Sequence, residues 1–312
     1  MEPGLTHVWG RAVFRFCRIG LYSVRVNDLT QDELLYALEK AIPEIMEEHQ
    51  AAATPWNPHD WVPWADGRNF AFLGGEDFDP NAQAPLPADV ASGLLALLLT
   101  KDNMPSYHRL MAQKASIFGA WQEVIGSWTA EDNRHSIALR DYLVVSRLVD
   151  PEVAETFRLH HVTKGKLQTP QSLTDYQILD VLALLAVHEL QCVSYEEKLI
   201  THSDSPILAG IVEKILHDDR VQAKTFTSFL NAGIDANVTE LLKSVDKAVA
   251  ELELIGSDID DFGDLDAIAK FNADATTIVA AAIVADLKLQ TLDGLDEASE
   301  AARQRILAAA GL

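Results

Sequence analysis

Apolar positions recur at helical spacing through most of the chain. A helix start is predicted at Thr30, because Glu33 follows three residues later as in a capping box. An amphipathic stretch over residues 34–49 follows it, and strand-like alternation is nearly absent from the whole sequence. Longer helices are predicted at residues 86–111, 115–148, 152–163, 173–200 and 206–230. The pattern therefore predicts an all-α protein.

These helices suggest one bundle domain over residues 28–312. Its core is expected at about residues 86–230, because long helices joined by short connections form bundles that can carry a site in their interior. Residues 236–312 are rich in Ala and Leu with acidic faces, which indicates two or three peripheral helices. Residues 56–80 hold Trp, Pro, Asp and Gly without periodicity, which indicates an ordered, irregular loop.

The first 27 residues differ from the rest. Arginines interrupt every candidate apolar core there, so the segment does not resemble a signal peptide. It is either a targeting or anchoring segment or an extension outside the fold, and we expect the extension.

Composition narrows the partners and the compartment. The 312 residues carry a formal net charge of -22, which disfavours nucleic acid and anionic membranes as partners. No apolar run is long and uncharged enough to predict a membrane span. Two cysteines, Cys17 and Cys192, make no disulfide framework, so a cytoplasmic location is expected.

Acidic residues with equal spacing mark the predicted bundle core. In each half, a carboxylate on one helix is followed thirty residues later by a carboxylate and then, three residues on, by His or Gln. The residues are Asp102, Asp132 and His135 in the first half, and Glu189, Asp219 and Gln222 in the second. The i, i+3 spacing places each pair on one helix face. This spacing is typical of the di-metal carboxylate bundle, a ferritin-like fold.

The residue types suit a site for hard divalent metals such as iron. Such metals prefer carboxylate oxygens, and imidazole also binds iron. The alternative is that these are ordinary surface acids of an acidic chain, and the repeated spacing argues against it.

Several stretches resemble the soluble acyl-acyl-carrier-protein desaturases, especially their mycobacterial branch. Residues 128–135, WTAEDNRH, are similar to the family's W-T-A-E-E-N-R-H motif. Residues 102–107, DNMPSY, and 56–60, WNPHD, resemble the segment around the family's first metal ligand and its W-x-P-x-D loop. The resemblance covers about residues 30–230 and is weaker in the second half.

The resemblance implies roles for individual residues. The implied iron ligands are Asp102, Asp132, His135, Glu189, Asp219 and Gln222. Asp218 matches the carboxylate that orients the histidine, and Trp56 matches a tryptophan on a proposed electron route. Cys192 stands where plant members have a threonine near the oxygen site. The family implies a homodimer that uses two Fe²⁺ ions, dioxygen and a ferredoxin-type electron donor to desaturate an acyl chain on acyl carrier protein.

Three residues depart from the family's pattern. Asp132 and Asp219 are each one methylene shorter than the bridging glutamates that they match, and Gln222 replaces a histidine. We therefore expect fewer than two irons per chain, with the better site at Asp102, Asp132 and His135. The sequence leaves two functions open: a desaturase, or a catalytically impaired homologue that keeps the bundle and one metal and acts as a binding or regulatory partner.

A basic run follows the motif helix. Its members are Arg134, Arg140, Arg147, Arg158, Lys164 and Lys166. The run is either a solvated face or a docking surface for the acidic carrier protein and the phosphate of its prosthetic group. His160 and His161 are adjacent on a predicted helix and point about 100° apart, which disfavours a metal site there.

Overall fold

The computed structural model describes residues 29–82, 84–116, 118–165, 167, 174–263 and 265–312. Every regular element in these ranges is an α-helix or a short 3-10 helix, which confirms the all-α prediction. The N-terminal segment 1–27 and Lys166 lie outside the described residues.

The N-terminal helices begin as the capping pattern predicts. In α1 (Gln31–Glu39), Thr30 and Glu33 form a capping box in which each side chain accepts a hydrogen bond from the other's backbone N–H. The predicted stretch 34–49 divides between α1 and α2 (Ile42–Ala52), which has proline in its first turn. The loop that follows is irregular, as predicted, with short 3-10 turns η2 (Pro58–Asp60), η3 (Trp64–Asp66) and η4 (Ala71–Leu73).

Four long helices form the bundle, α3 (Ala88–Asp102), α5 (Ala120–Val145), α8 (Ile178–Thr201) and α9 (Pro206–Ala250). Two smaller helices, α4 (Met104–Lys114) and α6 (Pro151–Lys164), complete the central part. The prediction of one helix over 86–111 was wrong at Asn103, where α3 ends and α4 begins. Pro105 lies in the first turn of α4, and a proline favours such a helix start over a helix interior.

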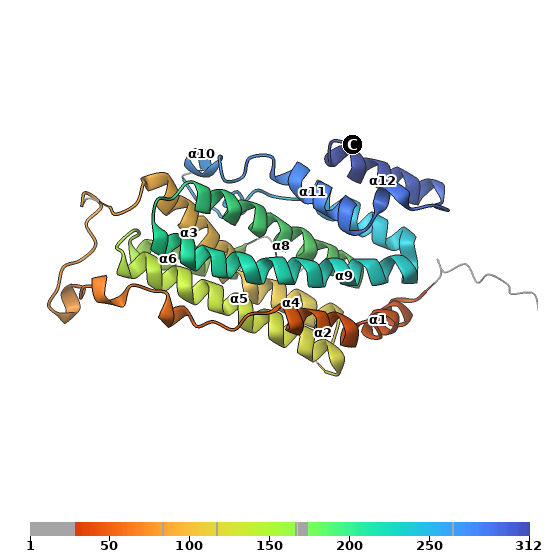
Figure 1. Ribbon diagram of the computed structural model, residues 1–312, viewed down its shortest axis with the longest axis horizontal. Helices are drawn as coiled ribbons and strands as arrows, with labels where there is room; N and C mark the ends of the chain where they lie inside the picture. The colour runs from red at the N-terminus through yellow and green to blue at the C-terminus, as the bar shows by residue number, and fades with distance from the viewer. Residues whose placement is uncertain (1–28, 83, 117, 166, 168–173, 264) are drawn as a thin grey trace, which may run out of the picture.

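The C-terminal helices lie along one side of the bundle (Figure 1). They are α10 (Leu265–Ile268), α11 (Ala275–Asp286) and α12 (Glu297–Ala309), with the short turn η6 (Leu289–Thr291) between the last two. Helix α9 continues past the predicted boundary at residue 230 and bends at Asn237, whose φ of -159° and ψ of 85° are not helical.

Helix α8 is the apolar centre of the fold. By length and composition alone it could cross a membrane, but 78% of its most apolar window is buried inside the bundle. The buried core helix of a soluble protein can be equally long and apolar, so the length and composition of α8 are weak evidence for a membrane span.

Candidate metal centre

Four acidic side chains lie buried between the long helices. Asp132 comes from α5, Glu189 and Glu196 from α8, and Asp219 from α9, and none is more than 1% exposed. Carboxylates at this depth are costly unless cations or hydrogen-bond donors compensate them. The cations that do so determine what this centre can bind.

Lys101 is the principal cation of the cluster. The buried stripe of α3 runs through Val90, Leu94, Leu97 and then Lys101, at intervals of four, three and four residues, and each of these residues is 0% exposed. The helical periodicity that buries the three apolar residues therefore also directs Lys101 into the core.

The ammonium group of Lys101 contacts three of the acids. Its Nζ lies 2.6 Å from Asp219 Oδ2, 3.2 Å from Asp132 Oδ1 and 3.6 Å from Glu189 Oε2. Burial alone would lower the pKa of Lys101, but the attraction of Asp132 and Asp219 outweighs it and holds that pKa well above its usual value. Lys101 therefore stays charged among the carboxylates.

The pKa values of two of the acids shift in opposite directions. Burial opposes the charge on Asp132, but Lys101 and His135 outweigh it and lower the pKa of Asp132. Burial raises the pKa of Glu189 to about 8 against the attraction of Lys101. The Trp128 indole N–H donates to the other Glu189 oxygen at 2.8 Å. Glu189 can thus remain in the core as a protonated acid.

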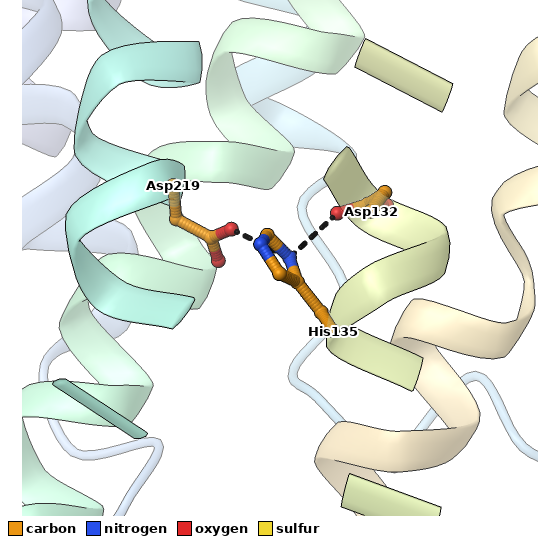
Figure 2. Close-up of side chains that lie close together, drawn as sticks. All are labelled: Asp132, His135 and Asp219. Atoms are coloured by element: carbon orange, nitrogen blue, oxygen red, sulfur yellow. Dashed lines mark hydrogen bonds and ion pairs between the residues drawn. The ribbon is translucent and has the colours of Figure 1, made fainter. Parts of the chain in front are cut away.

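His135 bridges the carboxylates of two helices (Figure 2). Its Nδ1 lies 3.1 Å from Asp132 Oδ1 and 3.3 Å from Asp219 Oδ1, and its Nε2 lies 3.0 Å from Asp218 Oδ2. Burial opposes protonation, but the hydrogen bonds to Asp132 and Asp218 outweigh it and raise the pKa of His135 to about 9. The ring is a second internal cation with both nitrogens engaged.

A hydrogen-bonded chain leads outward from His135. The Trp56 indole N–H donates to Asp218 Oδ2 at 2.8 Å, and the Trp56 ring stacks on His135 with centroids 6.2 Å apart. Arg134 donates to the same Asp218 oxygen and covers the Trp56 ring. The structure thus brings together Trp56, Asp218 and His135.

Asp102 does not join the cluster. Its carboxylate forms an ion pair with Arg140 on α5, and its side chain is 11% exposed. The two adjacent side chains point about 100° apart on α3, so Lys101 reaches Asp219 while Asp102 reaches Arg140. The sequence-based choice of Asp102 as the first-helix ligand therefore requires correction, because Lys101 occupies that face.

Gln222 is directed to a neighbouring network. Its amide N–H₂ donates to Glu131 Oε2 at 2.9 Å, while His49 Nε2 lies 3.0 Å from the other Glu131 oxygen. The Gln222 carbonyl oxygen has no hydrogen-bond partner within the described part of the chain. The structure therefore holds Gln222 through Glu131, the residue before Asp132.

Cys192 lies one turn after Glu189 on the buried face of α8. It is a free, fully buried thiol whose Sγ lies 3.9 Å from His188 Nε2, and burial raises its pKa well above the usual value. A thiol kept protonated is a poor nucleophile, so its contribution here is to packing.

Glu196 was missed by the sequence analysis. It lies seven residues after Glu189 on the same face of α8 and is 0% exposed. Neither of its carboxylate oxygens has a hydrogen-bond partner in the ranges that the structure describes. Burial, with repulsion from Asp219, raises the pKa of Glu196 well above its usual value. The repeat of seven residues was the available signal.

Comparison with known proteins identifies the family. The model of the family described as fatty acid desaturase matches residues 30–310. The chain belongs to this fatty acid desaturase family.

Two relatives in Mycobacterium tuberculosis, DesA1 and DesA2, are named as putative acyl-ACP desaturases. DesA1 is 34% identical over 238 residues, which are 75% of this chain and 70% of DesA1. DesA2 is 34% identical over 233 residues, which are 75% of this chain and 82% of DesA2. The X-ray structure of DesA2 covers 86% of this chain and 98% of its own, with a TM-score of 0.70 and 28% identity. The ferritin-like desaturase fold is thereby confirmed.

The side chains of this desaturase homologue do not fit the two irons of the resemblance. Asp132, His135 and Asp219 could hold one metal ion, because their ligand atoms lie within 4.8 Å of one another. However, Lys101 already binds both of these carboxylates, and His135 uses both ring nitrogens on acids. Two of the six implied ligands point away from the cluster, because Asp102 pairs with Arg140 and Gln222 donates to Glu131.

Three of the five described members of the basic run contact other parts of the molecule. Arg134 contacts Asp218, Arg140 contacts Asp102, and Arg147 donates to backbone carbonyls of residues 68, 69 and 76. These arginines therefore stabilise the fold around the bundle.

Two other described residues of the basic run remain candidates for the predicted docking surface. Arg158 is partly exposed and pairs with Glu155, and Lys164 is exposed at the end of α6. A docking surface that uses this run would depend on these two residues.

Proposed function

We propose that this protein binds an acyl chain on acyl carrier protein without desaturating it. Membership of the fatty acid desaturase family supports an acyl chain as the ligand. The observation that carries the non-catalytic assignment is the Lys101 ammonium, which lies 2.6–3.6 Å from Asp219, Asp132 and Glu189. An ammonium has no lone pair to offer a metal, and it repels divalent ions from these acids.

Lys101 also explains why the carboxylates can persist without metal. In the metal-binding bundles, divalent ions neutralise acids in the core. Here the positive charges come from Lys101 and His135, and Arg134 supports Asp218 from outside. The bundle can therefore keep its shape, and any binding function, without a redox centre.

Desaturation remains the second candidate, favoured by one observation. The chain from Trp56 through Asp218 to His135 matches the route that the resemblance proposes for electrons. Such a chain would have a catalytic use only if a metal displaced Lys101 from its acids.

One experiment separates the two candidates. Wild-type protein is titrated with saturated acyl carrier protein and then incubated with ferredoxin, its reductase, a reductant, iron and oxygen. We expect saturable binding and no new double bond by mass spectrometry of the released fatty acid. Formation of an unsaturated product would establish the desaturase candidate, and absence of binding would refute the proposed ligand.

A further inference from the structure

A pocket with both apolar and polar side chains in its wall lies between the end of α6, the first half of α8 and the end of α9. Its open volume is about 80 Å³, and Glu251 and Glu253 are exposed at its edge. Apolar residues such as Leu184 and Val187 share its wall with hydrogen-bonding side chains. A channel for a plain saturated chain needs an apolar wall, so these polar groups require another explanation.

His161 is the least satisfied of these groups. It lines the pocket at 3% exposure, yet neither ring nitrogen has a hydrogen-bond partner among the described residues. The carboxylate of Asp258, across the pocket wall, comes nearest, with 3.6 Å between His161 Nε2 and Asp258 Oδ2. Asp258 Oδ1 also lacks a partner. Buried polar atoms without partners are unfavourable, so both side chains gain from a ligand atom that bonds to them.

The same pocket reaches the buried charge cluster. Its lining includes His188, whose ring lies 4.5 Å from the ring of Tyr107, centroid to centroid. Burial lowers the pKa of His188 to about 4, and the charge of Lys101 adds to this effect. His188 is therefore close to the acidic cluster. The pocket thus borders the acidic centre through His188, the residue before Glu189.

We propose that the acyl chain bound here carries a hydroxyl group, which hydrogen-bonds with His161 and Asp258. This inference rests on the proposed function and specifies its ligand class. A hydroxyl both donates and accepts, so a single oxygen can serve a ring nitrogen and a carboxyl oxygen together. A saturated chain at this position would leave those atoms unpaired, and a site of this kind discriminates strongly against a ligand that lacks the hydroxyl.

The charge states agree with a neutral ligand group. Burial lowers the pKa of His161, although Asp258 opposes this effect. Burial likewise raises the pKa of Asp258 against the influence of His161. Both shifts disfavour the charged forms, and a site that disfavours charge suits an alcohol better than a charged headgroup.

The test compares matched acyl chains on carrier protein. Octanoyl carrier protein and a series with one hydroxyl placed at successive carbons are titrated against wild type, His161→Phe and His160→Phe. The phenylalanine at 161 keeps the ring and removes both nitrogens, and loss of unpaired polar atoms is not expected to unfold the protein. The His160 side chain is 41% exposed and pairs with Asp260 instead, so it is the matched control.

We expect one hydroxylated chain to bind wild type at least about tenfold tighter than octanoyl carrier protein. His161→Phe should reduce this preference to about twofold or less while it still binds the saturated chain, and His160→Phe should keep the preference. Equal affinity for all chains in wild type would overturn the hydroxyl proposal and leave the proposed function standing. Absence of binding by every chain would overturn both, and an unchanged preference in His161→Phe would overturn the assignment to His161.

Discussion

Replacement of Lys101 by methionine should lower the free energy of unfolding by about 3–5 kcal/mol, the usual cost of removing one partner of a buried ion pair. Methionine fills a similar volume, so the loss reflects charge and not a cavity. Asp132 and Asp219 would remain buried without the ammonium that now lies 3.2 and 2.6 Å from their oxygens. Protonation of the acids would relieve part of the cost.

Urea denaturation measures this difference, with Lys224→Met as the control. Lys224 is an exposed lysine on α9, and exposed substitutions usually change stability by no more than about 0.5 kcal/mol. If Lys101→Met is as stable as Lys224→Met, the ammonium is not the counterion of the cluster and the non-catalytic assignment loses its basis.

The same variant should become responsive to metal. Without the ammonium, a divalent ion can bind Asp132 and Asp219 and replace the proton of His135 Nδ1, which lies between them. At a concentration one hundred times its dissociation constant, such an ion would restore about 2.7 kcal/mol. Mn²⁺ or Zn²⁺ should therefore raise the melting temperature of Lys101→Met and leave that of wild type unchanged.

The second large effect concerns the double variant Lys101→Glu with Gln222→His. The glutamate converts the repelling cation into an oxygen ligand on the core face of α3, and the histidine supplies a nitrogen donor three residues after Asp219. We expect iron content to rise from well below one per chain toward two, with near-ultraviolet absorption from the oxidised metal. Recovery of desaturation should lag behind, because Asp132 and Asp219 remain short.

The single variants show which residue is responsible. Gln222→His alone should gain little iron, because Lys101 still pairs with the acids. Asp102→Asn in the double variant should not reduce iron content, because the Asp102 carboxylate pairs with Arg140 and does not face the acidic cluster. Full metal loading by Gln222→His alone would mean that Lys101 does not exclude metal.

The fold was largely predictable because it depends on patterns repeated over many residues. Helical periodicity and the capping box at Thr30 identified the helices, and the spacing of thirty residues placed Glu189 and Asp219 in one centre. The break between α3 and α4 at Asn103 was missed, because only this one residue separates two helices whose apolar pattern looks continuous in the sequence.

The site was harder to predict, because a rotation of the helix about its axis decides which of two adjacent residues faces the acidic cluster. Asp102 was chosen for its spacing of thirty residues to Asp132 and for the family resemblance, whereas the residue that reaches the acids is Lys101, which follows Leu94 and Leu97 on α3. A lysine within an apolar helix face was the signal that could have corrected the choice. The rotamer that turns Gln222 toward Glu131 depends on tertiary contacts that no local pattern encodes.

Iron content of the wild-type protein tests the central claim most directly. The protein is incubated anaerobically with excess Fe²⁺, separated from free metal and analysed by elemental analysis, with Lys101→Glu/Gln222→His treated in parallel. Because the Lys101 ammonium holds Asp132, Glu189 and Asp219, the account predicts well below one iron per wild-type chain and a clear gain in the double variant. One or two tightly held irons per wild-type chain would contradict it.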